Sequence, residues 1–200
     1  MVRRVVVALL APVKWTPPGI DPTRWRSALA EDVVDLLATL NEVETAVAVT
    51  PEDRSLADAV VWPGTAVHEV PEPTVDAVFA TLTGYDQAAV VVADAPDVPG
   101  LTLGKLLRPL SSRPVAVAPV EGSGTGLLGV AARLPVPAWL PALDLDTAAP
   151  AEVRAAAPRP GDVAVTAGWR RLRGPADLAS LDPAFEGWEA TRALLSGQPG

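Results

Sequence analysis

The sequence predicts an α/β fold with three layers, α/β/α, built around a mostly parallel sheet. Short, β-branched apolar runs recur between residues 5 and 118, as is typical of strands buried on both faces. Amphipathic segments with helical spacing separate these runs. Because the two kinds of segment alternate, helical crossovers between parallel strands are favoured.

Five apolar runs mark the expected strands, at residues 5–10, 46–49, 66–70, 88–93 and 115–118. Four helices are expected between them, at 28–40, 50–60, 74–82 and 102–110. The first places its leucines and Val33 on one face and its acids on the other. The second opens with Thr50 as N-cap and Pro51 at the first helical position.

The final third is less regular. Residues 134–150 are Pro-rich but contain Trp and Leu, which favours a packed loop over a free linker. Short helices are expected at 151–157, from 174 to 181 and at 186–195, with a strand and turn within 162–174. We therefore expect one domain over residues 1–195 and a flexible tail over 196–200.

Composition excludes several classes of function. The formal net charge is −8, from 24 acids and 16 bases, which argues against a general nucleic-acid binder. With no cysteine and a single histidine, thiolate and multi-histidine metal sites are excluded, so any metal would be Mg²⁺ or Mn²⁺ on carboxylates.

No apolar stretch reaches the ~18 residues of a membrane span. The opening run is short, ends at Pro12 and lacks a signal-peptide cleavage site, so we expect a cytoplasmic protein.

Three loops, 12–26, 94–99 and 119–126, follow the first, fourth and fifth predicted strands. Ligands of parallel sheets bind at this edge, beyond the carboxyl ends of the strands. Asp94 and Asp97 stand three residues apart in "ADAPD", where carboxylates could hold a cation that bridges phosphates. The alternative is that Asp94 caps the next turn and Asp97 is solvated.

The other two loops carry weaker signals. "PVEGSGTGLLG" has four glycines within residues 122–129, which let backbone N–H groups approach a ligand, although a flexible loop has the same composition. Lys14, Arg24 and Arg26 lie near the end of the first strand. They could hold phosphate, or they could be surface charges.

Taken together, the motifs resemble the nucleotide-diphospho-sugar transferase (GT-A-like) superfamily. The resemblance is to its small bacterial branch, related to 2-phospho-lactate guanylyltransferase and molybdenum-cofactor guanylyltransferase. Its opening motif, K-x-P-x-P-G-x-x-K-T-R-L, is matched by Lys14, Pro18, Gly19, Thr23 and Arg24. Its D-x-P-D-L-P signature is matched by the segment 94–99, and its D-G-G-Y loop and following apolar strand by 121–124 and "LLGVAARLP".

The resemblance implies a nucleotidyl- or glycosyltransferase that binds a nucleotide or sugar nucleotide and acts on a small-molecule acceptor. Asp94 and Asp97 would bind Mg²⁺ or Mn²⁺ and take part in catalysis. The phosphates would be contacted by Lys14, Gly19, Thr23, Arg24, Gly122 and Gly124. Whether the chain forms a homo-oligomer is left open.

Two departures from the motifs bear on activity. Pro22 replaces the second lysine of the opening motif, and Arg171 and Arg173 replace the acids of a late D-V-D-T motif. The arginines could take over phosphate neutralisation and make the site less dependent on metal. Alternatively, the chain is a non-catalytic nucleotide-binding or scaffold protein that kept the fold and lost transferase activity.

Overall fold

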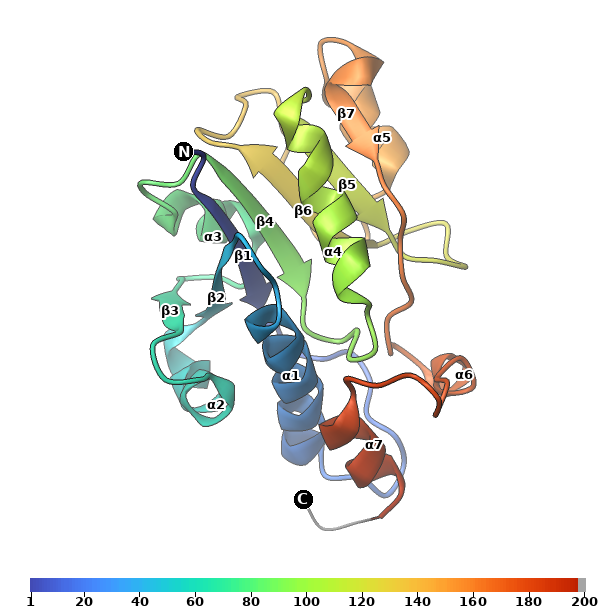
Figure 1. Ribbon diagram of the computed structural model, residues 1–200. Coiled ribbons are helices and arrows are strands. Elements are labelled where there is room, and N and C mark those ends of the chain that lie inside the picture. Colours follow the sequence, from blue (N-terminus) through green and yellow to red (C-terminus); the bar gives the residue numbers. More distant parts are fainter. Residues whose placement is uncertain (198–200) are drawn as a thin grey trace.

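The computed structural model of the chain describes residues 1–197 and contains one seven-stranded sheet (Figure 1). The strand order is β3-β2-β1-β4-β6-β5-β7. Neighbouring strands pair in parallel except β6, which is antiparallel to both β4 and β5. The strands are β1 (Arg4–Leu9), β2 (Glu44–Val49), β3 (Ala66–Glu69), β4 (Gln87–Val92), β5 (Val115–Pro119), β6 (Leu127–Arg133) and β7 (Val163–Val165).

Helices cover both faces of the sheet, so the predicted three-layer α/β/α arrangement is confirmed. In Figure 1, α1 and α4 lie on the near face, with α3 and α5 behind the sheet. The helix α7 packs against α1, away from the strands. The helices are α1 (Pro22–Ala38), α2 (Arg54–Val60), α3 (Val75–Thr81), α4 (Gly100–Leu107), α5 (Pro150–Ala156), α6 (Pro175–Leu178) and α7 (Glu189–Leu195), with short 3₁₀ turns at Pro51–Asp53, Arg108–Ser111 and Pro160–Asp162.

The centre of the sheet explains the continuous apolar runs. β1 pairs with β2 on one side and with β4 on the other, in register from Arg4 opposite Gln87 to Leu9 opposite Val92. Val5, Val6, Val7 and Ala8 are fully buried. Strands covered on both faces have no solvent side, so their residues do not alternate between apolar and polar.

The first helix begins six residues earlier than the periodicity predicts, at Pro22 instead of residue 28. Asp21 is its N-cap, and its carboxylate accepts a hydrogen bond of 2.9 Å from the backbone N–H of Arg24. An acidic N-cap followed by proline is a strong start signal, because proline lacks the N–H that would be unpaired there. The opening loop therefore ends at residue 21, and Thr23 and Arg24 lie on the first helical turn.

The strand that follows the Gly-rich loop is β6, which returns from β5 as a hairpin and inserts between β4 and β5. Gly129 makes this insertion fit, because a Cβ added there would lie 2.9 Å from the carbonyl oxygen of Val90. Of the tail expected over 196–200, residues 198–200 lie outside the described part of the chain.

The C-terminal helix α7 is held by a buried carboxylate. Asp32 on α1 is 2% exposed and accepts hydrogen bonds from the backbone N–H groups of Ala190 (2.9 Å) and Thr191 (2.8 Å). Burial raises the pKa of Asp32 to about 6. Beside it, Trp25 and Leu29 of α1 pack with residues of the opening loop and with α7.

Candidate functional site

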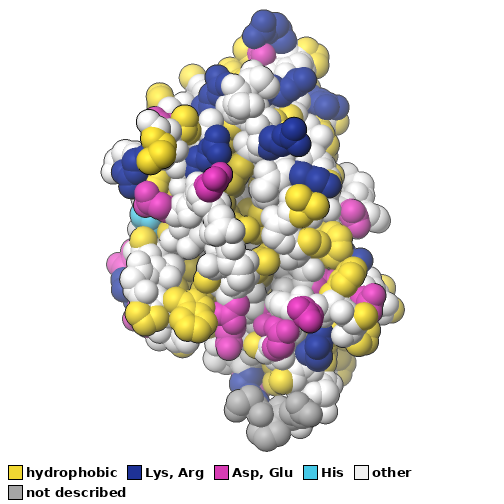
Figure 2. All heavy atoms as spheres, viewed as in Figure 1, with side chains coloured by type: hydrophobic (Ala, Val, Ile, Leu, Met, Phe, Trp, Pro, Cys, Tyr) yellow, Lys and Arg dark blue, Asp and Glu magenta, His cyan; other side chains and the backbone are white. Residues whose placement is uncertain are grey.

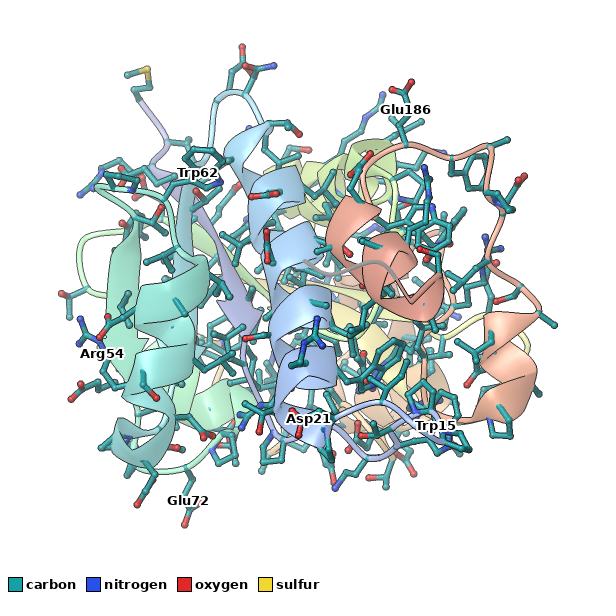
Figure 3. The ribbon with its side chains drawn as sticks, turned by 90° about the horizontal axis from the view of Figure 1, so that it is seen from below. Trp15, Asp21, Arg54, Trp62, Glu72 and Glu186 are labelled. Carbon is teal, nitrogen blue, oxygen red and sulfur yellow. The ribbon has the colours of Figure 1, made fainter. Side chains whose placement is uncertain are left out.

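A pocket of about 850 Å³ lies at the carboxyl ends of β1 and β4, the edge at which ligands of such sheets bind. Figure 3 views the molecule from this end, with Asp21 at the start of α1, Trp15 on the opening loop before it, and Glu72 just before α3 in the chain. The pocket is lined from five parts of the chain. They are the ends of β1 and β4 with their loops (Leu9, Ala11, Pro12, Val13, Lys14, Val92, Ala93, Asp94), the approach to and start of α3 (72–77), the segment 142–146, and Arg171.

The charges that line the pocket are predominantly acidic. Five carboxylates, those of Glu72, Asp76, Asp94, Asp144 and Asp146, face two cations, Lys14 and Arg171. A phosphate group entering such a site is repelled unless the carboxylates are neutralised. The pairing of these carboxylates therefore decides what the pocket can bind.

Asp94 is paired with Arg171 through two hydrogen bonds. The Nε of Arg171 lies 2.7 Å from Oδ1 of Asp94, and Nη2 lies 2.8 Å from Oδ2. Both residues are 6% exposed. This two-point geometry between guanidinium and carboxylate is the strong form of an ion pair. Both oxygens of Asp94 are occupied by it.

The remaining N–H groups of Arg171 are also occupied. Nη2 donates to Oδ1 of Asp146 at 2.7 Å, and Nη1 donates to the carbonyl oxygens of Leu145 (2.9 Å) and Leu127 (3.4 Å). Burial lowers the pKa of Arg171, but the hydrogen bonds and charge of Asp94 and Asp146 raise it more, so the net direction is upward. The guanidinium is fully paired and stays charged.

Asp146 links this pair to the opening loop. Its Oδ2 lies 3.5 Å from Nζ of Lys14, while its Oδ1 accepts from Arg171. Burial raises the pKa of Asp146, and the charges of Arg171 and Lys14 lower it more, so it lies below its ordinary value. A chain of charges, Lys14–Asp146–Arg171–Asp94, therefore joins four loops at the pocket.

Asp97 faces a different partner. Its side chain is 1% exposed and does not line the pocket. Oδ2 lies 3.0 Å from Nη2 of Arg170, and Oδ1 accepts a 3.0 Å hydrogen bond from Nε1 of Trp169. The guanidinium of Arg170 also lies over the Trp169 ring, 4.5 Å from its centroid. The structure thus does not bring Asp94 and Asp97 to a common ligand position.

Backbone contacts hold the segment 168–172 that supplies both arginines. Gly168 passes so close to β5 that an added Cβ would lie 2.1 Å from the carbonyl oxygen of Pro119. The N–H of Glu121 donates to the carbonyl of Trp169 (3.0 Å), and that of Leu172 donates to the carbonyl of Asp94 (2.9 Å). The arginines are therefore positioned by the main chain and do not depend on their ion pairs alone.

This pairing does not fit a divalent metal at the predicted carboxylates. All four oxygens of Asp94 and Asp97 accept hydrogen bonds from Arg171, Arg170 or Trp169. Within residues 1–197, no group of three or more His, Asp or Glu side chains is arranged to hold a metal ion. Because Mg²⁺ and Mn²⁺ need several free oxygen ligands, these two carboxylates as placed do not provide their site.

The other predicted phosphate contacts divide into two groups. Lys14 lies in the pocket with Asp94. Gly19, Thr23 and Arg24 are exposed at or just before the start of α1, outside the pocket lining. Gly122 and Gly124 are exposed in the turn between β5 and β6, also outside the lining.

Several site residues were not singled out from the sequence. Asp144 and Asp146 come from "LDLD" in the Pro-rich segment, where two acids alternating with leucines in a packed loop were the available signal. Glu72 and Asp76 lie on either side of the N-cap of α3. Arg170 stands beside Arg171 in "WRRLR" but faces Asp97.

The fold and the position of the pocket define the class. No protein-family model and no curated protein sequence matches the chain. Comparison with solved structures shows that it has the nucleotide-diphospho-sugar transferase fold. That predicted fold is confirmed, whereas the small bacterial branch stays a prediction.

Three solved structures illustrate the likeness. One, from Desulfovibrio desulfuricans G20, is named a "putative nucleotide-diphospho-sugar transferase" and has a TM-score of 0.65 at 16% identity, with 98% of each chain covered. The 4-diphosphocytidyl-2C-methyl-D-erythritol synthase of Anaerococcus prevotii has a TM-score of 0.61 at 9% identity, covering 97% of this chain and 96% of that one. The glucosyl-3-phosphoglycerate synthase of Mycobacterium tuberculosis, in complex with Mg²⁺ and uridine-diphosphate, has a TM-score of 0.54 at 16% identity, covering 100% and 80%. Identities this low establish the fold alone.

Across residues 1–197, the structure contains no helix that is both long and apolar enough to cross a membrane.

Proposed function

We propose that the chain binds a nucleotide or sugar nucleotide in the pocket at the carboxyl ends of β1 and β4 and acts as a nucleotidyl- or glycosyltransferase on a small-molecule acceptor. The observation that carries this proposal is the placement of Lys14 and Asp94 in one pocket of about 850 Å³ on this fold. The volume lies within the ~300–1,000 Å³ of small-molecule sites. The glucosyl-3-phosphoglycerate synthase that shares the fold holds a nucleoside diphosphate.

The residues supply distinct parts of such a reaction. Leu9, Val92 and Leu143 give the pocket apolar walls suited to a base or sugar face. Lys14 lies at the opening of the pocket with its side chain two-thirds exposed, so its ammonium can contact a phosphate. Within residues 1–197, the backbone N–H groups of Ala11 and Val13 donate to no acceptor. In both reaction types negative charge grows on a leaving phosphate, and these donors would stabilise it.

Arg171 would act indirectly. Its N–H groups are all engaged, so it would not bind the phosphate itself. It neutralises Asp94 and contacts Asp146, and this reduces the repulsion that the acidic lining exerts on a phosphate. We therefore propose a site whose electrostatics rest on Lys14 and Arg171, with no metal ion on Asp94 or Asp97.

A second candidate is a non-catalytic protein that binds a nucleotide or a partner and serves as a scaffold. The full pairing of Asp94, Asp97 and Arg171 favours this candidate. Their charged groups already bind one another or neighbouring side chains, and so are not available to a reacting ligand.

Thermal-shift measurements with CTP, GTP, UDP and UDP-glucose, each with Mn²⁺ or with EDTA, test the binding step. We expect stabilisation that persists in EDTA, is lost in Lys14→Ala and is kept in Arg54→Ala, an exposed arginine outside the pocket. Absence of a shift with every nucleotide would overturn the proposal. Stabilisation that needs Mn²⁺ and is lost in Asp94→Asn would overturn the metal-free site.

Turnover separates the two candidates. The bound nucleotide is incubated with pools of small phosphorylated and hydroxylated acceptors, and release of pyrophosphate or nucleoside diphosphate is followed. Release that is at least about tenfold slower in Lys14→Ala supports the transferase. Nucleotide binding with no release from any donor favours the scaffold.

A further inference from the structure

A second cavity, of about 390 Å³, lies between the α4–β5 connection, helix α5 and the edge strand β7. Arginines from separate elements converge on it: Arg108 from the end of α4, Arg113 from the approach to β5, and Arg154 from α5. The remaining lining comprises Pro109, Ser111, Ser112 and Val163–Val165.

This cavity is separate from the candidate transferase site. It lies where β5 begins and alongside β7, whereas the pocket of Lys14 and Asp94 lies where β1 and β4 end. These four strands all run in the same direction, so the two cavities lie toward opposite ends of the sheet. No residue lines both. Figure 2 shows dark blue Lys and Arg side chains over the upper part of the molecule and magenta acids gathered over the lower part.

Among the described residues, 1–197, no acid lines the second cavity. Within residues 1–197, Arg108, Arg113 and Arg154 form no salt bridge. The nearby carboxylate of Asp162 is already paired with Arg159 at 2.9 Å. Arg113 donates to the carbonyl oxygen of Gly161, which holds it at the cavity.

Three exposed guanidinium groups line one cavity and concentrate positive charge there, which favours the binding of an anion. Acids to neutralise them are abundant, since the chain carries 24 acids and 16 bases. Among residues 1–197, no acid lies in the lining of this cavity. The three arginines therefore have no carboxylate of the chain as a partner, and their charge is available to bind an anion.

We propose that this cavity binds a small polyanion that carries two or more phosphate groups. Guanidinium groups match phosphate oxygens through paired N–H donors, and several arginines favour several phosphates. The serines do not provide recognition by donation, because Ser111 and Ser112 already donate to the carbonyl oxygens of Arg108 (3.1 Å) and Pro109 (3.4 Å). The site is independent of the proposed transferase reaction.

The size and charge of the cavity favour a small ligand over nucleic acid. About 390 Å³ accommodates a di- or triphosphate group or a mononucleotide. A duplex needs a basic surface that extends over many phosphates, and the net charge of −8 opposes this.

Isothermal titration calorimetry with inorganic pyrophosphate and tripolyphosphate tests the proposal, at 50 and 150 mM salt. The site variant is Arg108→Gln/Arg154→Gln. The matched control is Arg54→Gln, which removes an exposed arginine on α2 that does not line the cavity. We expect a site, in addition to any in the Lys14 pocket, whose Kd rises at least about tenfold in the double variant and stays within about twofold in the control. Binding should persist in Lys14→Ala, which separates this result from failure or success of the proposed function.

Three results would overturn the proposal. One is no heat of binding for either anion up to millimolar concentration. Another is binding that is lost in Lys14→Ala and unchanged in the double variant, which would place the anion in the other pocket. The third is much tighter binding of a DNA duplex with a steep salt dependence, which would identify an extended nucleic-acid surface.

Discussion

The two cavities of this molecule use arginine in opposite ways. In the first, Arg171 is 6% exposed, pairs with Asp94 and Asp146, and has every N–H group engaged. In the second, three exposed arginines converge without an acid in the lining. The arginine of the first cavity has its anionic partners within the chain, whereas the arginines of the second cavity form no salt bridge within residues 1–197. Buried charge in this protein contributes to structure, whereas exposed charge of one sign is available to a ligand.

Two buried carboxylates, those of Asp32 and Asp94, can be compared in the same way, because only Asp94 is paired with a cation within residues 1–197. Asp32 and Asp94 are both almost fully buried, but within residues 1–197 Asp32 forms no salt bridge and is hydrogen-bonded to two backbone N–H groups of α7. Partial charges of N–H groups do not offset its burial, so its pKa rises to about 6.

The largest expected effect follows from breaking the complete network. Arg171→Met leaves Asp94 buried without a cation and Asp146 with Lys14 alone, which should lower the free energy of unfolding by about 3–5 kcal/mol. Urea denaturation measures this change. Arg54→Met, which breaks exposed ion pairs with Asp58 and Glu69, should change stability far less, because water screens exposed pairs.

A second substitution sharpens that result. If the loss arises from uncompensated charge, Arg171→Met/Asp94→Leu should be more stable than Arg171→Met alone, because one bare carboxylate is removed. A double variant as unstable as the sum of its single variants would mean that Arg171 acts through packing.

The next effect is a pH dependence from Asp32. Its folded-state pKa of about 6 exceeds the ordinary aspartate value of 3.8, so the folded protein binds the proton more tightly than the unfolded chain. Stability from this group is therefore present below about pH 4 and is lost as pH rises through 6, by roughly 3 kcal/mol in total. The difference in unfolding free energy between the wild type and Asp32→Asn, measured from pH 4 to 7, isolates this contribution. A difference independent of pH would contradict it.

The smallest effect concerns the second cavity in the absence of ligand. Removing like charges there should leave stability unchanged or raise it, so Arg108→Gln/Arg154→Gln should gain up to about 1 kcal/mol at low salt and less at high salt. Thermal unfolding at 20 and 500 mM salt measures this. A loss above about 1 kcal/mol would show that these arginines are structural, in the manner of Arg171.

The sequence predicts the sheet because strands that are buried on both faces consist of continuous apolar runs. Residues 5–10 and 88–93 are two such runs. It missed the start of α1, where Asp21 and Pro22 gave the signal but the apolar periodicity begins only farther along. It also did not show that β6 inserts between β4 and β5, since an apolar run does not specify which strands it pairs with.

For the candidate site, the sequence predicts which loops form it but not which side chains form ion pairs there. Lys14 and Asp94 were expected near one another because both follow central strands, and the structure places them in one pocket. Asp94 and Arg171 lie 77 residues apart, and Asp97 and Arg170 lie 73 apart. Pairings over such separations depend on how Gly168 brings the late segment past Pro119. No local pattern reveals that approach.

The contact between α1 and α7 has a consequence for synthesis of the chain. Trp25, Leu29 and Asp32 emerge from the ribosome long before residues 189–195, which cover or cap them in the native fold. Until α7 docks, a hydrophobic patch beside the opening loop faces water and an acidic side chain lacks its two amide donors. Helix α7, which is translated well after the opening loop, therefore completes the packing that holds the first loop of the pocket, and its removal would leave an exposed, aggregation-prone hydrophobic surface.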